Sequence, residues 1–241
     1  MLMEFIKPTK VLLAIIIGAI ALGCGVAMAA DNEDWANLRA YSQKNSELLL
    51  QGPMPHRVVF MGDSITEFWD KTKSDLFSDT HYVNRGISGQ TTPQMLLRFR
   101  QDVIALRPEA VVILAGTNDI AGNNGPVTNE QIQNNIMSMV DLARANNIKP
   151  ILCSIVPAAS YYWAPDLRPA PRIKAINTWM QAYARAQRIE YIDFYSPMET
   201  DGGALNAMYT GDGVHPNAEG YLIMTDLVKA KLSNLYRKQP R

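Results

Sequence analysis

The residues that can carry chemistry stand just after short apolar stretches of the sequence. Ser64 follows the apolar run Val58–Met61 across Gly62 and Asp63, and a helix is expected to begin directly after it. A hydroxyl between a strand end and a helix start lies at the carboxyl edge of the sheet, where open α/β folds bind ligands. Free backbone N–H groups and the helix dipole favour negative charge there. Ser64 is therefore a candidate nucleophile, and a helix-capping serine is the alternative.

A second set of polar residues could supply the other groups that a serine nucleophile needs. Cleavage of an ester needs a base, a group that orients the base, and hydrogen-bond donors for the oxyanion. His215 can accept the Ser64 proton because imidazole titrates near neutral pH, and Asp212, three residues earlier, can hold the other ring nitrogen. The oxyanion would accept hydrogen bonds from the backbone N–H groups of Ser64 and Gly89 and from the Asn118 side-chain amide. We expect glycine at position 89 because a substrate must approach that backbone closely.

Several of these residues also have a purely structural interpretation. His215 alone could be a surface histidine beside Pro216. Asp119 is the alternative to Asp212 as the acid that orients the histidine. We expect Asp119 instead to accept hydrogen bonds from backbone N–H groups in its own turn. Asp63 is assigned to the substrate-binding surface, and its alternative is an Asx turn that fixes the nucleophile loop.

The elements that must position these residues alternate along the chain. After residue 57, apolar strand-like runs and amphipathic helical runs follow each other five times. This alternation predicts an α/β fold with one parallel sheet, right-handed crossovers and helices on both faces. The loops after parallel strands open on one edge, so the distant polar segments converge there. The expected strands are 57–61, 82–84, 110–115, 150–156 and 189–195, and the expected helices are 31–50, 65–77 in part, 93–106, 130–147, 172–188 and 217–236.

The other histidines and the second cysteine are not expected to act in the chemistry. His56 and His81 precede strands, so they belong at the edge of the sheet opposite Ser64. Cys153 lies in an apolar strand-like run and is expected to be buried. Three separated histidines, and the single thiol that remains if the N-terminal segment with Cys24 is removed, predict no metal site, and no sequence motif indicates a cofactor.

Four short motifs resemble the sequence blocks of the SGNH (GDSL-like) serine hydrolases. Each motif alone is weakly specific, but all four occur in the family's order within residues 57–235. The motifs are Gly62-Asp63-Ser64-Ile65-Thr66, Gly86-Ile87-Ser88-Gly89-Gln90-Thr91-Thr92, Gly116-Thr117-Asn118-Asp119 and Asp212-Gly213-Val214-His215-Pro216. The stretch 84–119 looks especially like the platelet-activating-factor acetylhydrolase and lysophospholipase L1-like branch.

This resemblance implies a three-layer α/β/α sandwich of flavodoxin type, with five parallel strands in the order 2-1-3-4-5. Members of the superfamily cleave lipid acyl esters, acyl thioesters and carbohydrate acetyl esters, so the family alone does not fix the substrate. The residue roles that it implies are Ser64 as nucleophile, Asp212 and His215 as the acid–base pair, and Gly89 and Asn118 in the oxyanion hole, with Gly86 as the alternative glycine.

Composition narrows the class of partner. Lys and Arg together number 23, and Asp and Glu also number 23. The chain therefore has no excess of positive charge that would favour binding to nucleic acid. We expect a small or neutral partner, and nothing in the sequence indicates an oligomeric state. The length suits one catalytic domain, expected over residues 31–241.

The N-terminus resembles a bacterial export signal. Two lysines precede an apolar run, and Ala27-Met28-Ala29 offers the small residues that a signal peptidase reads. We interpret residues 1–29 as a cleaved signal peptide, which predicts a periplasmic or secreted enzyme with no stable membrane insertion. The alternatives are lipidation at Cys24, after a loose lipobox, and an uncleaved anchor.

Three aromatic residues could select the substrate. Tyr161, Tyr162 and Trp163 follow the fourth expected strand on the catalytic edge, where they could stack on a sugar or line an acyl pocket. Their alternative is to cover the core beneath the loop. We expect a serine esterase that removes small acyl groups, preferably acetyl, from a small-molecule or glycan ester. Two alternatives remain, a lysophospholipase or thioesterase for longer acyl chains and a non-catalytic binding domain of the same fold.

Overall fold

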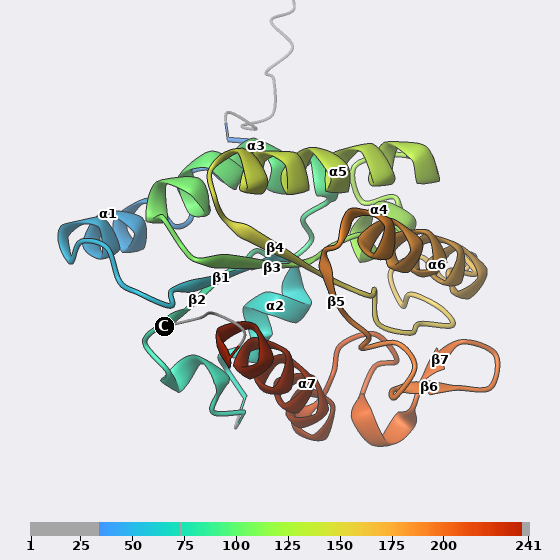
Figure 1. Ribbon diagram of the computed structural model, residues 1–241. Coiled ribbons are helices and arrows are strands. Elements are labelled where there is room, and N and C mark those ends of the chain that lie inside the picture. The colour runs from blue at the N-terminus through green and yellow to red at the C-terminus, as the bar shows by residue number, and fades with distance from the viewer. Residues whose placement is uncertain (1–33, 73, 238–241) are drawn as a thin grey trace, which may run out of the picture. The chain divides into compact units, whose positions relative to one another are not determined.

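A five-stranded parallel sheet forms the centre of the fold. Its strands lie in the order β2-β1-β3-β4-β5, and every pair of neighbours is parallel (Figure 1). All residues of β1 and β3 are buried, as expected when helices cover both faces of a parallel sheet. The strands are β1 (Val58–Gly62), β2 (Tyr82–Gly86), β3 (Ala110–Leu114), β4 (Lys149–Cys153) and β5 (Glu190–Ile192).

The computed structural model describes residues 34–72 and 74–237, and these belong to a compact unit that begins at Asp34. The predicted signal segment over residues 1–29, with Cys24, lies outside the described residues. Within the described ranges, no helix has both the length and the apolar character needed to cross a bilayer.

Two apolar cores hold helices against the two faces of the sheet. Alternate residues of β1 point to opposite faces, so Val59 and Met61 join one core while Val58 and Phe60 join the other. The first core contains α3 (Thr92–Asp102), α5 (Asn129–Ala145) and α6 (Ala170–Gln187), and the second contains α2 (Ser64–Trp69) and α7 (Ala218–Arg237). Figure 1 shows α3 and α5 above the sheet and α2 and α7 below it.

Shorter elements complete the described chain. They are α1 (Ser42–Leu50), α4 (Thr117–Ala121), the 3₁₀ turns Leu76–Ser78, Ile104–Leu106 and Ala207–Tyr209, and an antiparallel pair of β6 (Glu199–Thr200) and β7 (Ala204–Leu205). The loop containing Asp212 and His215 follows this pair and leads into α7.

The predicted α/β sandwich and its strand order are confirmed. Cys153 is fully buried, as expected, and burial raises the pKa of its thiol. One predicted helix is wrong over its first half, because residues 34–41 form turns and α1 begins only at Ser42. The Asp34 carboxylate accepts hydrogen bonds from the backbone N–H groups of Leu38 and Arg39 at 2.6 and 2.9 Å, which closes a turn there.

The turn from β1 into α2 has no room for a side chain at Gly62. A Cβ atom at that position would lie 2.0 Å from Thr66 Oγ1 and 2.9 Å from the Leu114 carbonyl oxygen. Asp63 then caps α2, since its carboxylate accepts a hydrogen bond from the Ile65 backbone N–H at 3.0 Å. Asp63 is 1% exposed, and burial raises the pKa of its carboxyl to about 7.

A buried arginine joins this turn to the loop after β2. The Arg98 guanidinium donates hydrogen bonds to the Gly62 carbonyl at 3.0 Å, to Gln90 Oε1 at 2.5 Å and to Asp102 Oδ2 at 3.0 Å. Asp102 also accepts a hydrogen bond from Asn45 Nδ2 at 2.6 Å. Both charged side chains are fully buried. A buried ion is tolerated when it is paired and hydrogen-bonded, as Arg98 and Asp102 are.

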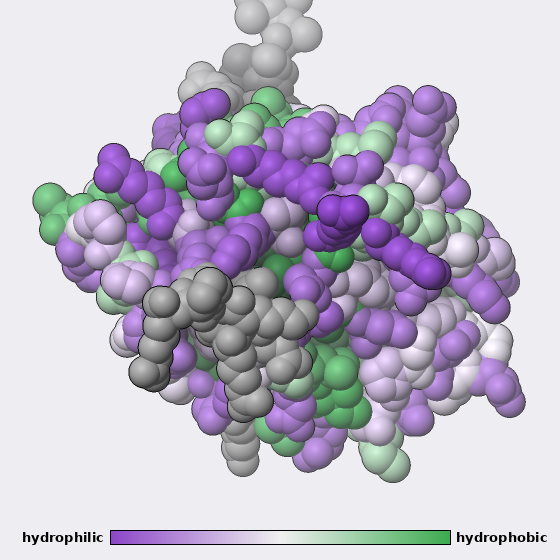
Figure 2. Space-filling view, in the orientation of Figure 1, coloured by the Kyte–Doolittle hydropathy of each residue, from purple (hydrophilic) through white to green (hydrophobic). Residues whose placement is uncertain are grey.

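Hydrophilic side chains cover most of the surface seen in Figure 2, with a small apolar projection at the end of α1. Leu49 and Leu50 end this helix and are both exposed. Scattered exposed leucines of this kind are ordinary for a folded domain.

Replacing Arg98 with methionine should lower the free energy of unfolding by about 3–5 kcal/mol, because it leaves the Asp102 carboxylate buried without its cation. Urea unfolding followed by circular dichroism measures this loss. Arg100→Met is the matched control, since Arg100 is exposed on the same helix, and it should change stability by less than about 0.5 kcal/mol. Equal losses in the two variants would contradict the importance of the buried pair.

Asp63→Asn should alter how stability depends on pH. A folded-state pKa near 7 lies above the ordinary value of 3.8, so Asp63 stabilises the fold most below pH 4 and loses this contribution as pH rises to 7. Relative to the variant, the wild type should lose roughly 3–5 kcal/mol over this range. Thermal and urea unfolding between pH 4 and 8 test the difference. Asp226→Asn, at an exposed position of α7, is the control, and a difference that stays constant with pH for Asp63→Asn would refute the shift.

Candidate active site

The structure brings a hydroxyl, an imidazole and a carboxylate into one hydrogen-bonded line. Ser64 Oγ lies 3.0 Å from His215 Nε2, and His215 Nδ1 lies 2.7 Å from Asp212 Oδ2. Ser64 begins α2, whereas His215 and Asp212 precede α7, so the contact joins segments 151 residues apart. With Nδ1 protonated toward Asp212, Nε2 is the acceptor that faces the Ser64 hydroxyl. The arrangement can activate Ser64 as a nucleophile.

The Asp212 loop is held by its own hydrogen bonds. Asp212 Oδ1 accepts the backbone N–H groups of Val214 and His215 at 2.9 and 2.8 Å. The Thr210 hydroxyl donates to the His215 carbonyl at 2.8 Å. Partial burial alone would raise the pKa of Asp212, but the hydrogen bonds from the His215 ring and from these N–H groups outweigh it and lower the pKa. Asp212 thus stays ionised and can stabilise a protonated imidazole.

Two aromatic rings lie near the His215 ring. The Phe68 centroid is 5.4 Å away, and the Trp163 centroid is 6.5 Å away. Phe68 belongs to α2, and Trp163 belongs to the loop after β4. These rings limit how the imidazole can turn and give the surface beside it an apolar character.

Hydrogen-bond donors are found in the segments predicted to bind an oxyanion. In the part of the chain that the structure describes, the backbone N–H groups of Ser64 and Gly89 have no hydrogen-bond acceptor. The first N–H groups of a helix lack an internal partner, which explains the free group at Ser64. Asn118 lies in α4, and its Nδ2 is 3.0 Å from the Gln90 carbonyl oxygen and 3.4 Å from Asp63 Oδ2. The second contact is long and therefore weak, so the amide hydrogen that faces Asp63 can turn to a better acceptor.

Gly89 and Gly86 need to be glycine for different reasons. Gly89 has a φ of +77°, which favours glycine, and a Cβ atom there would meet only Asn123 Nδ2 at 4.0 Å. The φ angle alone accounts for the glycine, and close approach of a substrate to this backbone stays a prediction. A Cβ atom at Gly86 would lie 2.2 Å from the Glu67 backbone nitrogen, so Gly86 is needed for the packing of α2.

The three aromatic residues predicted to contact substrate differ in their burial. Tyr161 is fully buried and belongs to the core, so its assignment to the substrate-binding surface is wrong. Tyr162 and Trp163 are 67% and 37% exposed, and the Trp163 ring stacks on Tyr161 at 4.9 Å. The core interpretation therefore holds for Tyr161, whereas contact of Tyr162 and Trp163 with substrate stays a prediction.

The neighbouring carboxylates serve the backbone. Asp63 is buried and caps α2, so the structure contradicts its assignment to the substrate-binding surface and supports the Asx-turn alternative. Asp119 accepts hydrogen bonds from the Thr92 backbone N–H at 2.9 Å and hydroxyl at 2.6 Å. It therefore anchors the start of α3 instead of its own turn. Burial is the main cause that raises the pKa of Asp119.

The other histidines lie where expected, at the amino edge of the sheet. His56 precedes β1, and the His81 carbonyl accepts the Val58 backbone N–H at the start of the same strand. His81 Nδ1 lies 2.7 Å from Asp79 Oδ1, so it forms a histidine–aspartate pair at this edge. Among the described residues, no group of histidine, cysteine and acidic side chains could hold a metal ion.

Sequence reasoning missed three residues that contact this site. Arg98 fixes the nucleophile turn, Phe68 lies beside His215, and Asn123 contacts Asn118. An arginine and an aspartate four residues apart on an otherwise apolar helix stripe were a signal for Arg98. Phe68 and Asn123 carry no comparable signal in one sequence.

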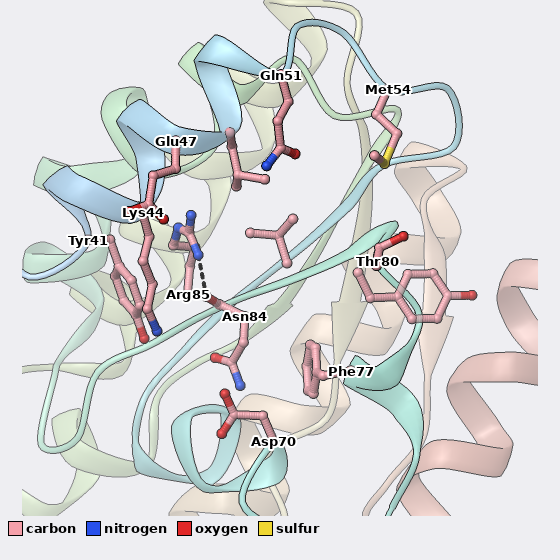
Figure 3. A pocket seen from close by; sticks show the side chains of 13 residues that line it. Tyr41, Lys44, Glu47, Gln51, Met54, Asp70, Phe77, Thr80, Asn84 and Arg85 are labelled. Atoms are coloured by element: carbon pink, nitrogen blue, oxygen red, sulfur yellow. Dashed lines mark hydrogen bonds between the residues drawn. The ribbon is translucent and has the colours of Figure 1, made fainter.

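A separate groove runs beside the edge strand β2. It has a volume of about 420 Å³ and is lined mainly by α1, the turn after α2 and β2 (Figure 3). Tyr41 donates a hydrogen bond to the Gly86 carbonyl, and Arg85 donates to the Asn84 carbonyl at 2.7 Å, as Figure 3 shows for Arg85. Side chains thus occupy outward-facing carbonyls of the edge strand. None of the groove's lining residues belongs to the Ser64–His215–Asp212 line.

Known proteins of similar sequence or fold include acylhydrolases and esterases. A putative acylhydrolase from Bacteroides fragilis NCTC 9343 is 48% identical, with a TM-score of 0.81 over 84% of this chain and 98% of that one. Esterase TesA of Pseudomonas aeruginosa is 30% identical over 70% of this chain and 84% of its own length. Acetylxylan esterase of Xylanibacter ruminicola is 24% identical over 73% of this chain and 43% of its own length. The chain spans about a third of the length of some other curated relatives.

The sequence profile described as the GDSL-like Lipase/Acylhydrolase family matches residues 60–223. This match runs from β1 to α7 and so includes Ser64, Gly89, Asn118, Asp212 and His215. It covers more than half of the chain, and it supports a hydrolase activity on esters. The chain belongs to the GDSL-like lipase/acylhydrolase family.

Proposed function

We propose that the protein is a serine esterase that works through an acyl-enzyme on Ser64. The observation that carries this proposal is the 3.0 Å contact between Ser64 Oγ and His215 Nε2, with Asp212 on the other side of the ring. A helix-capping serine or a surface histidine would have no reason to form this line. A non-catalytic binding domain likewise gives no role to His215 and Asp212.

The proposed reaction has two halves. Ser64 Oγ bonds to the ester carbonyl carbon while His215 Nε2 accepts its proton, and Asp212 stabilises the resulting imidazolium. The carbonyl oxygen becomes an oxyanion that accepts hydrogen bonds from the Ser64 and Gly89 N–H groups and the Asn118 amide. The carbon–oxygen bond to the alcohol then breaks, and the alcohol takes the proton from His215. Water repeats the sequence on the acyl-enzyme, releasing the carboxylic acid and restoring Ser64.

We assign small acyl groups, preferably acetyl, to the site. Similarity to acetylxylan esterase supports an acetyl ester on a carbohydrate, and the exposed ring of Trp163 near His215 offers a face on which a sugar could stack. The second candidate is a lysophospholipase or thioesterase for longer acyl chains. The description of the matching family, which includes lipases, favours this candidate.

The enzyme is proposed to act outside the cytoplasm as a single domain over residues 31–241. This proposal depends on the sequence of residues 1–29, with its lysines, apolar run and Ala27-Met28-Ala29. Lipidation at Cys24 is the alternative that would keep the same domain at a membrane surface.

Ser64→Ala and His215→Ala should each lower kcat/KM for p-nitrophenyl acetate by at least ~10³-fold, and Asn118→Ala by ~10²-fold or more. The first two changes remove the nucleophile or its base, and the third removes one oxyanion donor. His81→Ala is the matched control, because His81 pairs with Asp79 at the same 2.7 Å distance but at the amino edge. A Ser64→Ala enzyme that keeps its activity would end the assignment, as would fluorophosphonate labelling that does not depend on Ser64.

A series of p-nitrophenyl esters from acetate to palmitate should show the highest kcat/KM for acetate, with a fall as the acyl chain lengthens. The physical reason is that the proposed site gains specificity at the alcohol side, near Trp163, and not from acyl-chain burial. Release of acetate from acetylated xylo-oligosaccharides is the companion measurement. A maximum at eight carbons or more would transfer the assignment to the long-chain alternative.

A further inference from the structure

We propose that Asn123 is a positioning residue of the oxyanion hole, and that the indole N–H of Trp163 orients it. Asn123 would hold the Asn118 amide in the one orientation that directs an N–H group toward the reacting carbonyl. This inference rests on the proposed esterase function.

Three side chains form a continuous chain of hydrogen bonds into the site. Trp163 Nε1 donates to Asn123 Oδ1 at 3.0 Å, and Asn123 Nδ2 donates to Asn118 Oδ1 at 2.8 Å. Asn123 Nδ2 also lies 3.4 Å from the Gly89 carbonyl oxygen. Asn123 therefore contacts both loops that supply oxyanion donors, and it links them to the exposed ring beside His215.

The chemistry of the partners fixes each amide in turn. An indole N–H can only donate, so the oxygen of Asn123 must face Trp163 and its NH₂ group must face away. That NH₂ group can only donate, so the oxygen of Asn118 must face Asn123. The NH₂ group of Asn118 then faces the Gln90 carbonyl at 3.0 Å and Asp63 Oδ2 at 3.4 Å, and the hydrogen in the longer contact is the one offered to the oxyanion.

Rotation of the Asn118 amide by 180° would be unfavourable at both ends. Its oxygen would meet the Gln90 carbonyl oxygen, and its NH₂ group would meet that of Asn123. Without Asn123, only the contact with Gln90 and the long contact with Asp63 would oppose this rotation. A rotated amide presents an oxygen where the oxyanion needs a donor, so a fraction of the enzyme would lose one oxyanion contact.

Trp163 connects the Asn118 and Asn123 amides to the surface where substrate is proposed to bind. Trp163 is 37% exposed, and its ring stacks on the buried Tyr161 ring at an interplanar angle of 21°. Tyr161 therefore fixes the plane of the indole and the direction of its N–H group. This gives the buried tyrosine a role in the site that does not require contact with substrate.

Asn123→Ala should lower kcat for p-nitrophenyl acetate by about 10- to 30-fold with little change in KM, which is less than the loss expected from removing the Asn118 donor itself. Asn123→Asp should lose about as much as Asn123→Ala, because a carboxylate still accepts from Trp163 but cannot donate to Asn118. Trp163→Phe keeps a smaller aromatic ring and removes the N–H group, so it should lower kcat by about 3- to 10-fold. Full activity in Asn123→Asp would overturn the proposal.

A double-mutant cycle separates positioning from a general structural effect. In an Asn118→Ala background, Asn123→Ala should cause no further loss of kcat, because its action passes through Asn118. Two losses that multiply would overturn the proposal. Asn124→Ala is the matched control, since Asn124 is exposed on the same loop but donates to Thr91 and Gln94 at 3.0 and 2.7 Å. This control should keep the wild-type kcat.

Two measurements distinguish failure of this inference from failure of the esterase assignment. Fluorophosphonate labelling and loss of activity in Ser64→Ala test the nucleophile without reference to Asn123. Thermal unfolding of every Asn123 variant should match the wild type within a few degrees, because Asn123 is exposed. A nucleophile at Ser64 together with an Asn123→Ala enzyme of unchanged kcat would refute the positioning role alone.

Discussion

Close packing of the first turn of α2 on two neighbouring strand ends is the constraint on which the site depends. Gly62 and Gly86 are register partners at the ends of β1 and β2. A Cβ atom at either position would collide with α2, at Thr66 Oγ1 in one case and at the Glu67 nitrogen in the other. The helix therefore lies directly on the backbone of both strands. This contact sets where Ser64 stands and leaves its N–H group at the open edge of the sheet.

The buried Arg98 extends that constraint to the loop after β2. Its guanidinium contacts the Gly62 carbonyl before the nucleophile and the Gln90 side chain next to Gly89. The Gln90 carbonyl in turn accepts the Asn118 amide. One side chain thus ties together the three segments that hold the oxyanion donors. A buried cation is costly unless it is paired, and Asp102 on the next turn of α3 provides the pair.

The sheet and the Ser64–His215–Asp212 line could be predicted from sequence because their signals are local. Apolar runs such as Ala110–Leu114 indicate buried strands, and parallel strands place the loops after them at one edge. The path of residues 34–41 could not be predicted, because an Asp34 side chain competes with helical hydrogen bonding there. Helix α4 is five residues long, which is too short to show a period. Contacts such as that of Asn123 with Trp163 depend on how two distant loops pack together. A single sequence contains no local pattern that predicts such packing.

Two carboxylates close to the same site show how environment assigns their roles. Asp212 is partly exposed and accepts the His215 ring together with several other donors, which keeps it ionised and suited to orient an imidazole. Asp63 is adjacent to the nucleophile in sequence, but it is buried with few donors, and the pKa of its carboxyl rises to about 7. A carboxyl that is largely neutral in mildly acidic solution cannot offer a steady negative charge to a protonated histidine. Hydrogen-bond geometry and ionisation state therefore both assign to Asp212 the role of orienting His215, although Asp63 is closer to Ser64 in the sequence.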